Sequence, residues 1–331
     1  TAQANFLDVS TVLATLPTAT TRRIVTWCVE MFGPADHSLT PSCSSSAEIP
    51  VSNGFAIHER AVEFGSPAVF GMISEPIGPA RGPVAVLLNV ASEHHVGPSR
   101  MWVDLAREWA SLGLRAVRVD LSGLGDSPSA PGQRPGLAFP YNALFNMRQI
   151  ANTVSPDDPT GLVWMGMCSG GYHALEAAAA FGAAGAFVVN PKFTIVPPEG
   201  RLATQESWRR MCCVIPAWAR NPSKSDKIPL RSPRHIRGLV YRCLYKLGLR
   251  STPAGGLREL NRRSKLTTIV SAPDDAKPLL RFRWARMAGR YSNVQLQVIA
   301  NLDHSLLHTP QRKEVAAMAT VWMITRSSAE S

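Results

Sequence analysis

The chain has 331 residues, which is enough for one large domain or for a core with an insertion. With 45% hydrophobic and 18% charged residues it has the composition of a globular protein, which excludes a disordered or fibrous chain. The net charge is +11. No apolar run is long enough for a transmembrane helix, and the N-terminus lacks the pattern of a signal peptide.

The first 50 residues contain one predicted amphipathic helix, over residues 20–33, followed by a Ser- and Pro-rich stretch typical of a loop. Strand patterns begin near Ile57. Two alternating segments, 56–64 and 68–76, are separated by a Gly-Ser-Pro turn and predict an antiparallel pair. The continuous apolar run over 84–90 predicts a strand that is buried on both faces of a parallel sheet.

Predicted helices and strands then alternate along the chain. Helices are expected at 101–113, 141–154, 170–182, 279–289 and 310–324, and strands at 114–120, 161–167, 184–190, 266–271 and 293–300. This order implies an α/β fold in which a mostly parallel sheet carries helices on both faces.

A composition shift interrupts the alternation after the sixth predicted strand. Residues 192–266 contain 17 Lys and Arg but 4 Asp and Glu, a balance of +13, so the rest of the chain balances at −2. We therefore expect three parts: residues 1–50 as an extension of unassigned role, residues 51–191 with 267–331 as the core, and residues 192–266 as a basic helical lid.

Two potential nucleophiles, Cys168 and Ser169, lie side by side where a predicted strand meets a predicted helix. In a nucleophile elbow the reacting residue occupies a tight turn, and the residues two positions to either side must be small. Cys168 is flanked in this way by Gly166 and Gly170, whereas Ser169 would be flanked on one side by Met167. The spacing predicts Cys168 as the nucleophile and the backbone N–H of Ser169 as an oxyanion donor.

A second motif begins at the end of the predicted strand 114–120. It matches the pattern DxxGxGxS with Asp120, Gly123, Gly125 and Ser127. With the elbow GMCSGG, this order resembles the α/β-hydrolase superfamily over residues 57–191 and 267–326. The resemblance implies an eight-stranded, mostly parallel sheet and the chain order nucleophile, acid, histidine. The stretches NVASEHHVGPSRMWVDLA and CSGGYHA are similar to those of serine aminopeptidase-like and exosortase-associated hydrolases.

The resemblance also assigns the other catalytic residues. The histidine should follow the last strand, where His304 is preferred to His308. The acid should follow the seventh strand, where Asp274 is preferred and Asp275 stays open as the alternative.

The loop after the third strand of the family pattern should supply a second oxyanion donor. The family's HG-x turn aligns with residues 89–91, which makes the backbone N–H of Ala91 the expected donor. His94 and His95 lie in the same loop and are candidates for substrate contact.

A cysteine nucleophile suits acyl transfer through a thioester, because exchange between a substrate thioester and a thiol is close to thermoneutral. Cysteine elbows of the superfamily resemble those of dienelactone hydrolases, polyester synthases and some thioesterases. The leading hypothesis is therefore an acyltransferase or thioesterase whose donor is an acyl carrier protein or acyl-CoA, attracted by the basic lid. The alternatives are an ester, lactone or amide hydrolase, and a non-catalytic binding module.

The six cysteines show no CxxC spacing and no disulfide framework, so we expect a reduced, cytoplasmic protein. No cofactor, no metal and no specific nucleic-acid partner are expected. The acceptor is expected to be water or a small molecule.

Overall fold

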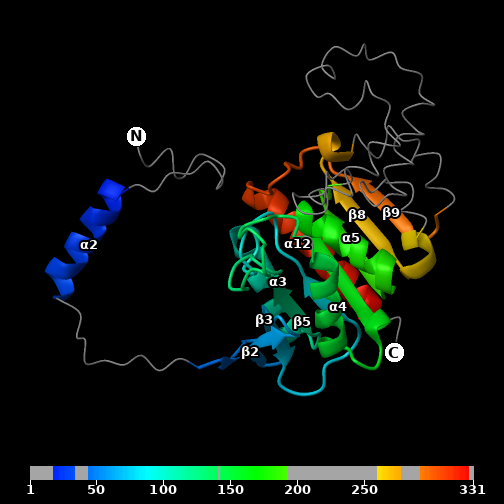
Figure 1. The fold of residues 1–331 in the computed structure, drawn as a ribbon, viewed down its shortest axis with the longest axis horizontal. Helices are drawn as coiled ribbons and strands as arrows, with labels where there is room; N and C mark the ends of the chain where they lie inside the picture. Colours follow the sequence, from blue (N-terminus) through cyan, green and yellow to red (C-terminus); the bar gives the residue numbers. More distant parts are fainter. Residues whose placement is uncertain (1–17, 34–43, 141, 193–258, 277–290, 328–331) are drawn as a thin grey trace, which may run out of the picture. The chain divides into compact units, whose positions relative to one another are not determined.

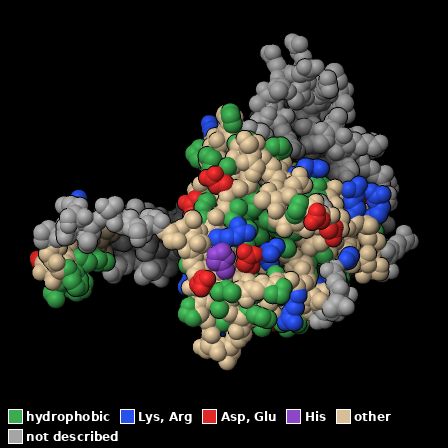
Figure 2. Space-filling view, turned by 90° about the horizontal axis from the view of Figure 1, so that it is seen from below, with side chains coloured by type: hydrophobic (Ala, Val, Ile, Leu, Met, Phe, Trp, Pro, Cys, Tyr) green, Lys and Arg blue, Asp and Glu red, His purple; other side chains and the backbone are tan. Residues whose placement is uncertain are grey.

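The computed structural model describes residues 18–33, 44–140, 142–192, 259–276 and 291–327. The chain divides into two units, Thr1–Ser44 and Ser45–Ser331. In the first, the predicted amphipathic helix is present as α2 (Thr18–Phe32), which buries no residue. Its hydrophobic side chains lie on the outside (Figure 2), with Trp27 53% and Phe32 76% exposed. No helix in the described ranges has both the length and the apolar character that a membrane crossing requires.

The described part of the second unit is built around one nine-stranded sheet (Figure 1). In chain order its strands are β1 (Ser46–Ile49), β2 (Ile57–Phe64), β3 (Val69–Pro76), β4 (Val84–Leu87), β5 (Ala116–Val119), β6 (Leu162–Met167), β7 (Gly185–Val189), β8 (Thr267–Ser271) and β9 (Val294–Val298). Their spatial order is β1-β2-β3-β5-β4-β6-β7-β8-β9. The strands β4 to β9 are mutually parallel, while β3 runs antiparallel to both of its neighbours.

The eight predicted strands are all present, and the expected mostly parallel sheet is confirmed. The expected number of strands is corrected from eight to nine, because Ser46–Ile49 pairs antiparallel with β2. This segment fell within the stretch of unassigned role. It is short and nearly all exposed, so it lacks the apolar alternation that marked the other strands.

In the described part of the chain, four helices cover the two faces of this sheet. The helices α3 (Met101–Ser111) and α12 (Thr309–Ser327) pack on one face, and α4 (Ala143–Val154) and α5 (Ser169–Phe181) pack on the other. Two tryptophans connect α12 to its neighbours. Trp109 on α3 donates a hydrogen bond to Thr320 Oγ1 on α12 at 3.0 Å, and Trp322 on α12 donates one to Thr268 Oγ1 on β8 at 2.9 Å.

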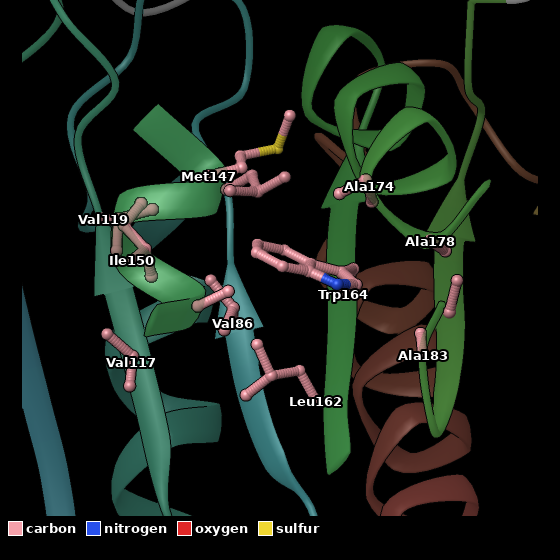
Figure 3. Close-up of a cluster of buried hydrophobic side chains, with 14 of the residues drawn as sticks. Val86, Val117, Val119, Met147, Ile150, Leu162, Trp164, Ala174, Ala178 and Ala183 are labelled. Carbon is pink, nitrogen blue, oxygen red and sulfur yellow. The ribbon is translucent and has the colours of Figure 1, made fainter. Parts of the chain in front are cut away.

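The largest side chain of the second layer is Trp164, which is fully buried in the middle of β6. Figure 3 shows it between Met147 and Ile150 of α4 on one side and Ala174 and Ala178 of α5 on the other. The small alanines of α5 let this helix lie close to the sheet, and the indole fills the space that they leave.

The parallel strands bring the candidate residues to one edge. The loops that follow β4, β5, β6, β7, β8 and β9 all leave the carboxyl edge of the sheet, where ligands bind in open α/β folds. Nearly all of the predicted lid, and the predicted helix over 279–289, lie outside the described residues; of the lid, 259–263 is helical.

Replacing the central indole tests this packing. We expect Trp164→Ala to lower the free energy of unfolding by about 3–5 kcal/mol, because it leaves a large cavity between α4 and α5. Urea denaturation would measure the change. Trp27→Ala, on the exposed helix α2, is the matched control and should change the value by less than about 0.5 kcal/mol. Equal effects of the two substitutions would contradict the packing described here.

Candidate active site

The junction between β6 and α5 has the backbone of a nucleophile elbow. Strand β6 ends at Met167 and α5 begins at Ser169, so Cys168 is the single residue between them. Cys168 has φ 54° and ψ −112°, a conformation that a residue with a side chain rarely adopts. The strained backbone at Cys168 changes the direction of the chain sharply between β6 and α5. Cys168 therefore lies just beyond the end of β6.

The two glycines around Cys168 are required by close backbone contacts. A Cβ on Gly166 would collide with the backbone of Gly170, and a Cβ on Gly170 would collide with the carbonyl of Asn89. By contrast, Met167 is buried and packs in the layer formed by α3 and α12. The glycine spacing indicates Cys168 as the reacting residue, and Cys168 is also the residue at which the chain turns from β6 into α5.

His304, in the loop after β9, connects Cys168 to a carboxylate. Its Nδ1 lies 2.7 Å from Asp275 Oδ2, which leaves Nε2 as the ring nitrogen for the thiol. The hydrogen bond with Cys168 raises the pKa of His304, and the hydrogen bond and charge of Asp275 raise it further, against the opposing effect of burial. The three side chains thus form a continuous Cys-His-Asp arrangement.

The acid of this arrangement is Asp275, the alternative that the sequence left open. His304 Nδ1 is hydrogen-bonded to Asp275 and not to the preferred Asp274; both carboxylates belong to the helical residues 273–276 after β8. Lys192 Nζ lies 3.7 Å from the other oxygen of Asp275. The second candidate histidine, His308, is exposed and lies at the start of α12.

The two expected oxyanion residues lie next to each other. Ser169 is the first residue of α5, where backbone N–H groups and the helix dipole favour negative charge. The N–H of Ala91 donates to Ser169 Oγ at 2.8 Å. The amide of Ala91 is therefore already hydrogen-bonded, and it must exchange this partner, or share it, before it can bind a substrate oxygen.

Asp120, at the end of β5, holds the neighbouring loops in place. Its fully buried carboxylate accepts hydrogen bonds from Asn89 Nδ2 at 2.6 Å, His95 Nδ1 at 2.9 Å and the N–H of Asp126 at 3.0 Å. Burial on its own would raise the pKa of Asp120, but these hydrogen bonds bring it below its ordinary value. A Cβ on Gly125 would collide with this carboxylate, which explains one glycine of the DxxGxGxS pattern.

The two candidate substrate-contact histidines have different surroundings. The side chain of His95 is 9% exposed and is paired with Asp120. The side chain of His94 is 41% exposed, and its Nε2 lies 2.9 Å from Asp126 Oδ2. Of the two, His94 is the one that is open to solvent.

A comparison with sequence models of protein families identifies the family of the chain. The sequence model described as the alpha/beta hydrolase family matches residues 91–318, more than two thirds of the chain. The chain belongs to the alpha/beta hydrolase family. It is accordingly an enzyme of hydrolase fold. A search of curated proteins finds no match.

Solved structures with similarity to this chain include three with different descriptions. The first is a dienelactone hydrolase from Anabaena variabilis ATCC 29413, with 12% identity, a TM-score of 0.48, and 86% of this chain and 100% of that chain covered. The second is a thioesterase domain from the curacin biosynthetic pathway, with 19% identity, a TM-score of 0.46, and 80% of this chain and 99% of that chain covered. The third is an acetyl xylan esterase from Paenibacillus sp. R4, with 17% identity, a TM-score of 0.47, and 86% of this chain and 89% of that chain covered.

One residue that positions the candidate site was not predicted. Asn190, directly after β7, is fully buried with φ 46°. Its amide nitrogen donates to the backbone carbonyls of Asp303 and His304 at 3.1 and 3.0 Å, and its oxygen accepts from the N–H of Ala272 at 2.7 Å. Asn190 thus fixes the histidine loop to the acid loop. An asparagine directly after a buried strand was the available signal, since asparagine tolerates positive φ.

The identity of the acid can be tested without a substrate. We expect the pKa of His304, followed by NMR of its ring protons, to lie above the ordinary value of a histidine in the unchanged protein. Asp275→Asn should lower this pKa, because it removes the negative charge that stabilises the imidazolium. Asp274→Asn is the matched control and should leave it unchanged. A lowered pKa in Asp274→Asn alone would assign the acid to Asp274.

Proposed function

We propose that this hydrolase-fold enzyme is an acyltransferase or thioesterase that forms a covalent acyl-thioester on Cys168. The observation that carries the proposal is the chain of contacts from Cys168 through His304 to Asp275 at the strained elbow. A nucleophile, a base in contact with it and a group that orients the base are the components of covalent acyl transfer.

The chemical steps use these side chains in order. His304 takes the proton of the Cys168 thiol through Nε2 while the sulfur forms a bond to the acyl carbonyl carbon of the donor. Asp275 holds the imidazolium that results. The tetrahedral oxyanion is stabilised by the N–H of Ser169 and by the N–H of Ala91, once Ala91 has exchanged its bond to the serine hydroxyl.

Release of the donor and of the product completes the cycle. When the tetrahedral intermediate collapses, the bond to the donor's leaving group breaks, and the leaving group takes the proton from His304. Water or a small-molecule acceptor then gives a proton to His304 and attacks the thioester carbonyl. Collapse of the second intermediate returns the proton to the sulfur of Cys168 and frees the acyl product.

The chemistry of sulfur favours a thioester as the donor. Exchange of an acyl group between two thiols replaces one thioester bond by another, so its free-energy change is close to zero. Forming the same intermediate from an oxygen ester is uphill, because an oxygen ester is more stable than a thioester. A thiol nucleophile is therefore better matched to an acyl group that arrives on coenzyme A or on a carrier protein.

The charge of the chain supports the same donor. The excess of positive charge lies in residues 192–266, which in the sequence separate the strand before Asn190 from the strand before Asp275. A basic segment inserted between two strands of the site would attract the phosphates of coenzyme A or the acidic surface of an acyl carrier protein. We propose this segment as the docking element for such a donor.

Trapping the intermediate tests the nucleophile and the donor class together. Intact-protein mass spectrometry after separate incubations with acyl-CoA, an acylated carrier protein and a simple oxygen ester should show one acyl adduct with the two thioester donors. We expect Cys168→Ala to abolish the adduct. Cys28→Ala, which removes the other free cysteine of the described residues, should leave it unchanged.

Other results would exclude parts of the proposal. An adduct that persists in Cys168→Ala would exclude this nucleophile. Labelling by oxygen esters alone would exclude the thioester donor and favour a plain ester, lactone or amide hydrolase. Neither adduct nor turnover with any donor would favour a non-catalytic binding module.

The docking role of the basic segment predicts a dependence on ionic strength. We expect kcat/KM for an acyl carrier protein donor to fall by about tenfold or more as salt is raised, because the Debye length shrinks from about 8 Å at 0.15 M to about 3 Å at 1 M. A short, uncharged thioester of N-acetylcysteamine is the matched control. Parallel salt dependence of both donors would argue against electrostatic docking.

A further inference from the structure

We propose that His94, His95, Asp120 and Asp126 form a binding site for one divalent transition-metal cation, with Zn²⁺ as the best fit. The proposal concerns the loops after β4 and β5 and does not depend on the catalytic activity proposed above. It differs from the role in substrate contact that the sequence suggested for the two histidines.

The four side chains offer ligand atoms at the spacing of a single ion. One atom from each of them lies within 4.8 Å of the others. The pairs His94 Nε2–Asp126 Oδ2 and His95 Nδ1–Asp120 Oδ2 are both 2.9 Å apart, and His95 Nδ1 lies 4.0 Å from Asp126 Oδ2. Ligands about 2.0–2.2 Å from a tetrahedral zinc ion are roughly 3.3–3.6 Å from one another, so small side-chain adjustments would complete the site.

The charges of the cluster favour a divalent cation. Asp120 is completely buried, and within the described ranges no Lys or Arg forms an ion pair with Asp120 or Asp126. The positive partners that the described residues provide are imidazoles, which carry charge only when protonated. One divalent ion would balance both carboxylates at any pH at which the imidazoles are neutral.

The types of donor atom select among metals. Two imidazole nitrogens with two carboxylate oxygens suit Zn²⁺ and similar transition metals, whereas Ca²⁺ and Mg²⁺ prefer oxygen ligands alone. His94 and Asp126 form the solvent side of the site, with side chains 41% and 52% exposed. His95 and Asp120 form the buried side, with side chains 9% and 0% exposed. A cation can therefore enter between His94 and Asp126.

Metal binding would replace two hydrogen bonds by coordination bonds. In the structure each imidazole donates to a carboxylate through the nitrogen that would bind the ion, so a neutral ring would carry its proton on the other nitrogen, His94 Nδ1 or His95 Nε2, when the ion is bound, and a doubly protonated ring would release one proton to solvent. Two of the ligands belong to the loop after β4, and the other two belong to the loop after β5. The ion would therefore link the loop that carries Ala91 to the loop of the DxxGxGxS pattern.

Spectroscopy with Co²⁺ distinguishes this site from the thiols of the chain. We expect the chelator-treated protein to bind one Co²⁺ and to show the visible d–d bands of a four-coordinate ion, without the near-ultraviolet band of a cobalt–thiolate bond. Excess Zn²⁺ should displace the cobalt. A thiolate band at one equivalent, or no binding of either ion, would overturn the proposal.

Two variants on the solvent side locate the ion. His94→Asn and Asp126→Asn should each weaken Zn²⁺ binding by about tenfold or more, as measured by titration calorimetry. His58→Asn is the matched control and should leave the Zn²⁺ affinity unchanged. His58 also faces a carboxylate, with Nδ1 3.7 Å from Glu75 Oε1, but it lies outside the cluster. Unchanged affinity in both cluster variants would overturn the proposal.

Crystallography provides a measurement that needs no variant. Anomalous diffraction at the zinc edge, from crystals of the unchanged protein soaked in Zn²⁺, should place one peak between the four side chains. A peak at Cys168 and His304 in its place would contradict the site.

Discussion

The close approach of backbone segments beneath Cys168 is the constraint on which the rest of the site depends. A Cβ on Gly166 would collide with the backbone of Gly170, and a Cβ on Gly170 would collide with the carbonyl of Asn89, so the end of β6, the start of α5 and the segment after β4 meet without intervening side chains. This contact forces the strained φ of Cys168 and starts α5 at the next residue. The turn can be maintained because the layers on both sides of β6 are densely packed, as the buried Trp164 illustrates.

Two buried asparagines extend this constraint to the other loops of the candidate site. Asn89 donates to Asp120 and to the carbonyl of Glu93, and its oxygen accepts from the N–H of Leu121, which joins the loops after β4 and β5. Asn190 joins the acid loop to the histidine loop in the same way. In both cases one amide satisfies several backbone groups that would otherwise be buried without partners. The site is therefore fixed by hydrogen bonds between loops as well as by the sheet.

The sequence predicted those features that depend on local spacing. The strands from Ile57 onward followed from hydrophobic periodicity, and Cys168 followed from the positions of two glycines. Strand β1 was missed because four mostly exposed residues carry no such periodicity. The choice between Asp274 and Asp275 depends on which of two adjacent residues in the helical stretch 273–276 faces His304, and adjacent residues give no local signal for that. The role of Asn190 and the grouping of His94 with Asp126 arise from contacts between distant segments.

The hydrogen bond between Ala91 and Ser169 has a consequence for selectivity between ground state and transition state. In the resting site the serine hydroxyl occupies the position beside the amide that a substrate oxygen would need. A neutral carbonyl gains little by displacing it, since one uncharged acceptor replaces another. An oxyanion is a much stronger acceptor and can displace the hydroxyl. In the proposed mechanism the serine is therefore an internal competitor, and the amide of Ala91 would strengthen its interaction with the substrate as negative charge develops on the oxygen.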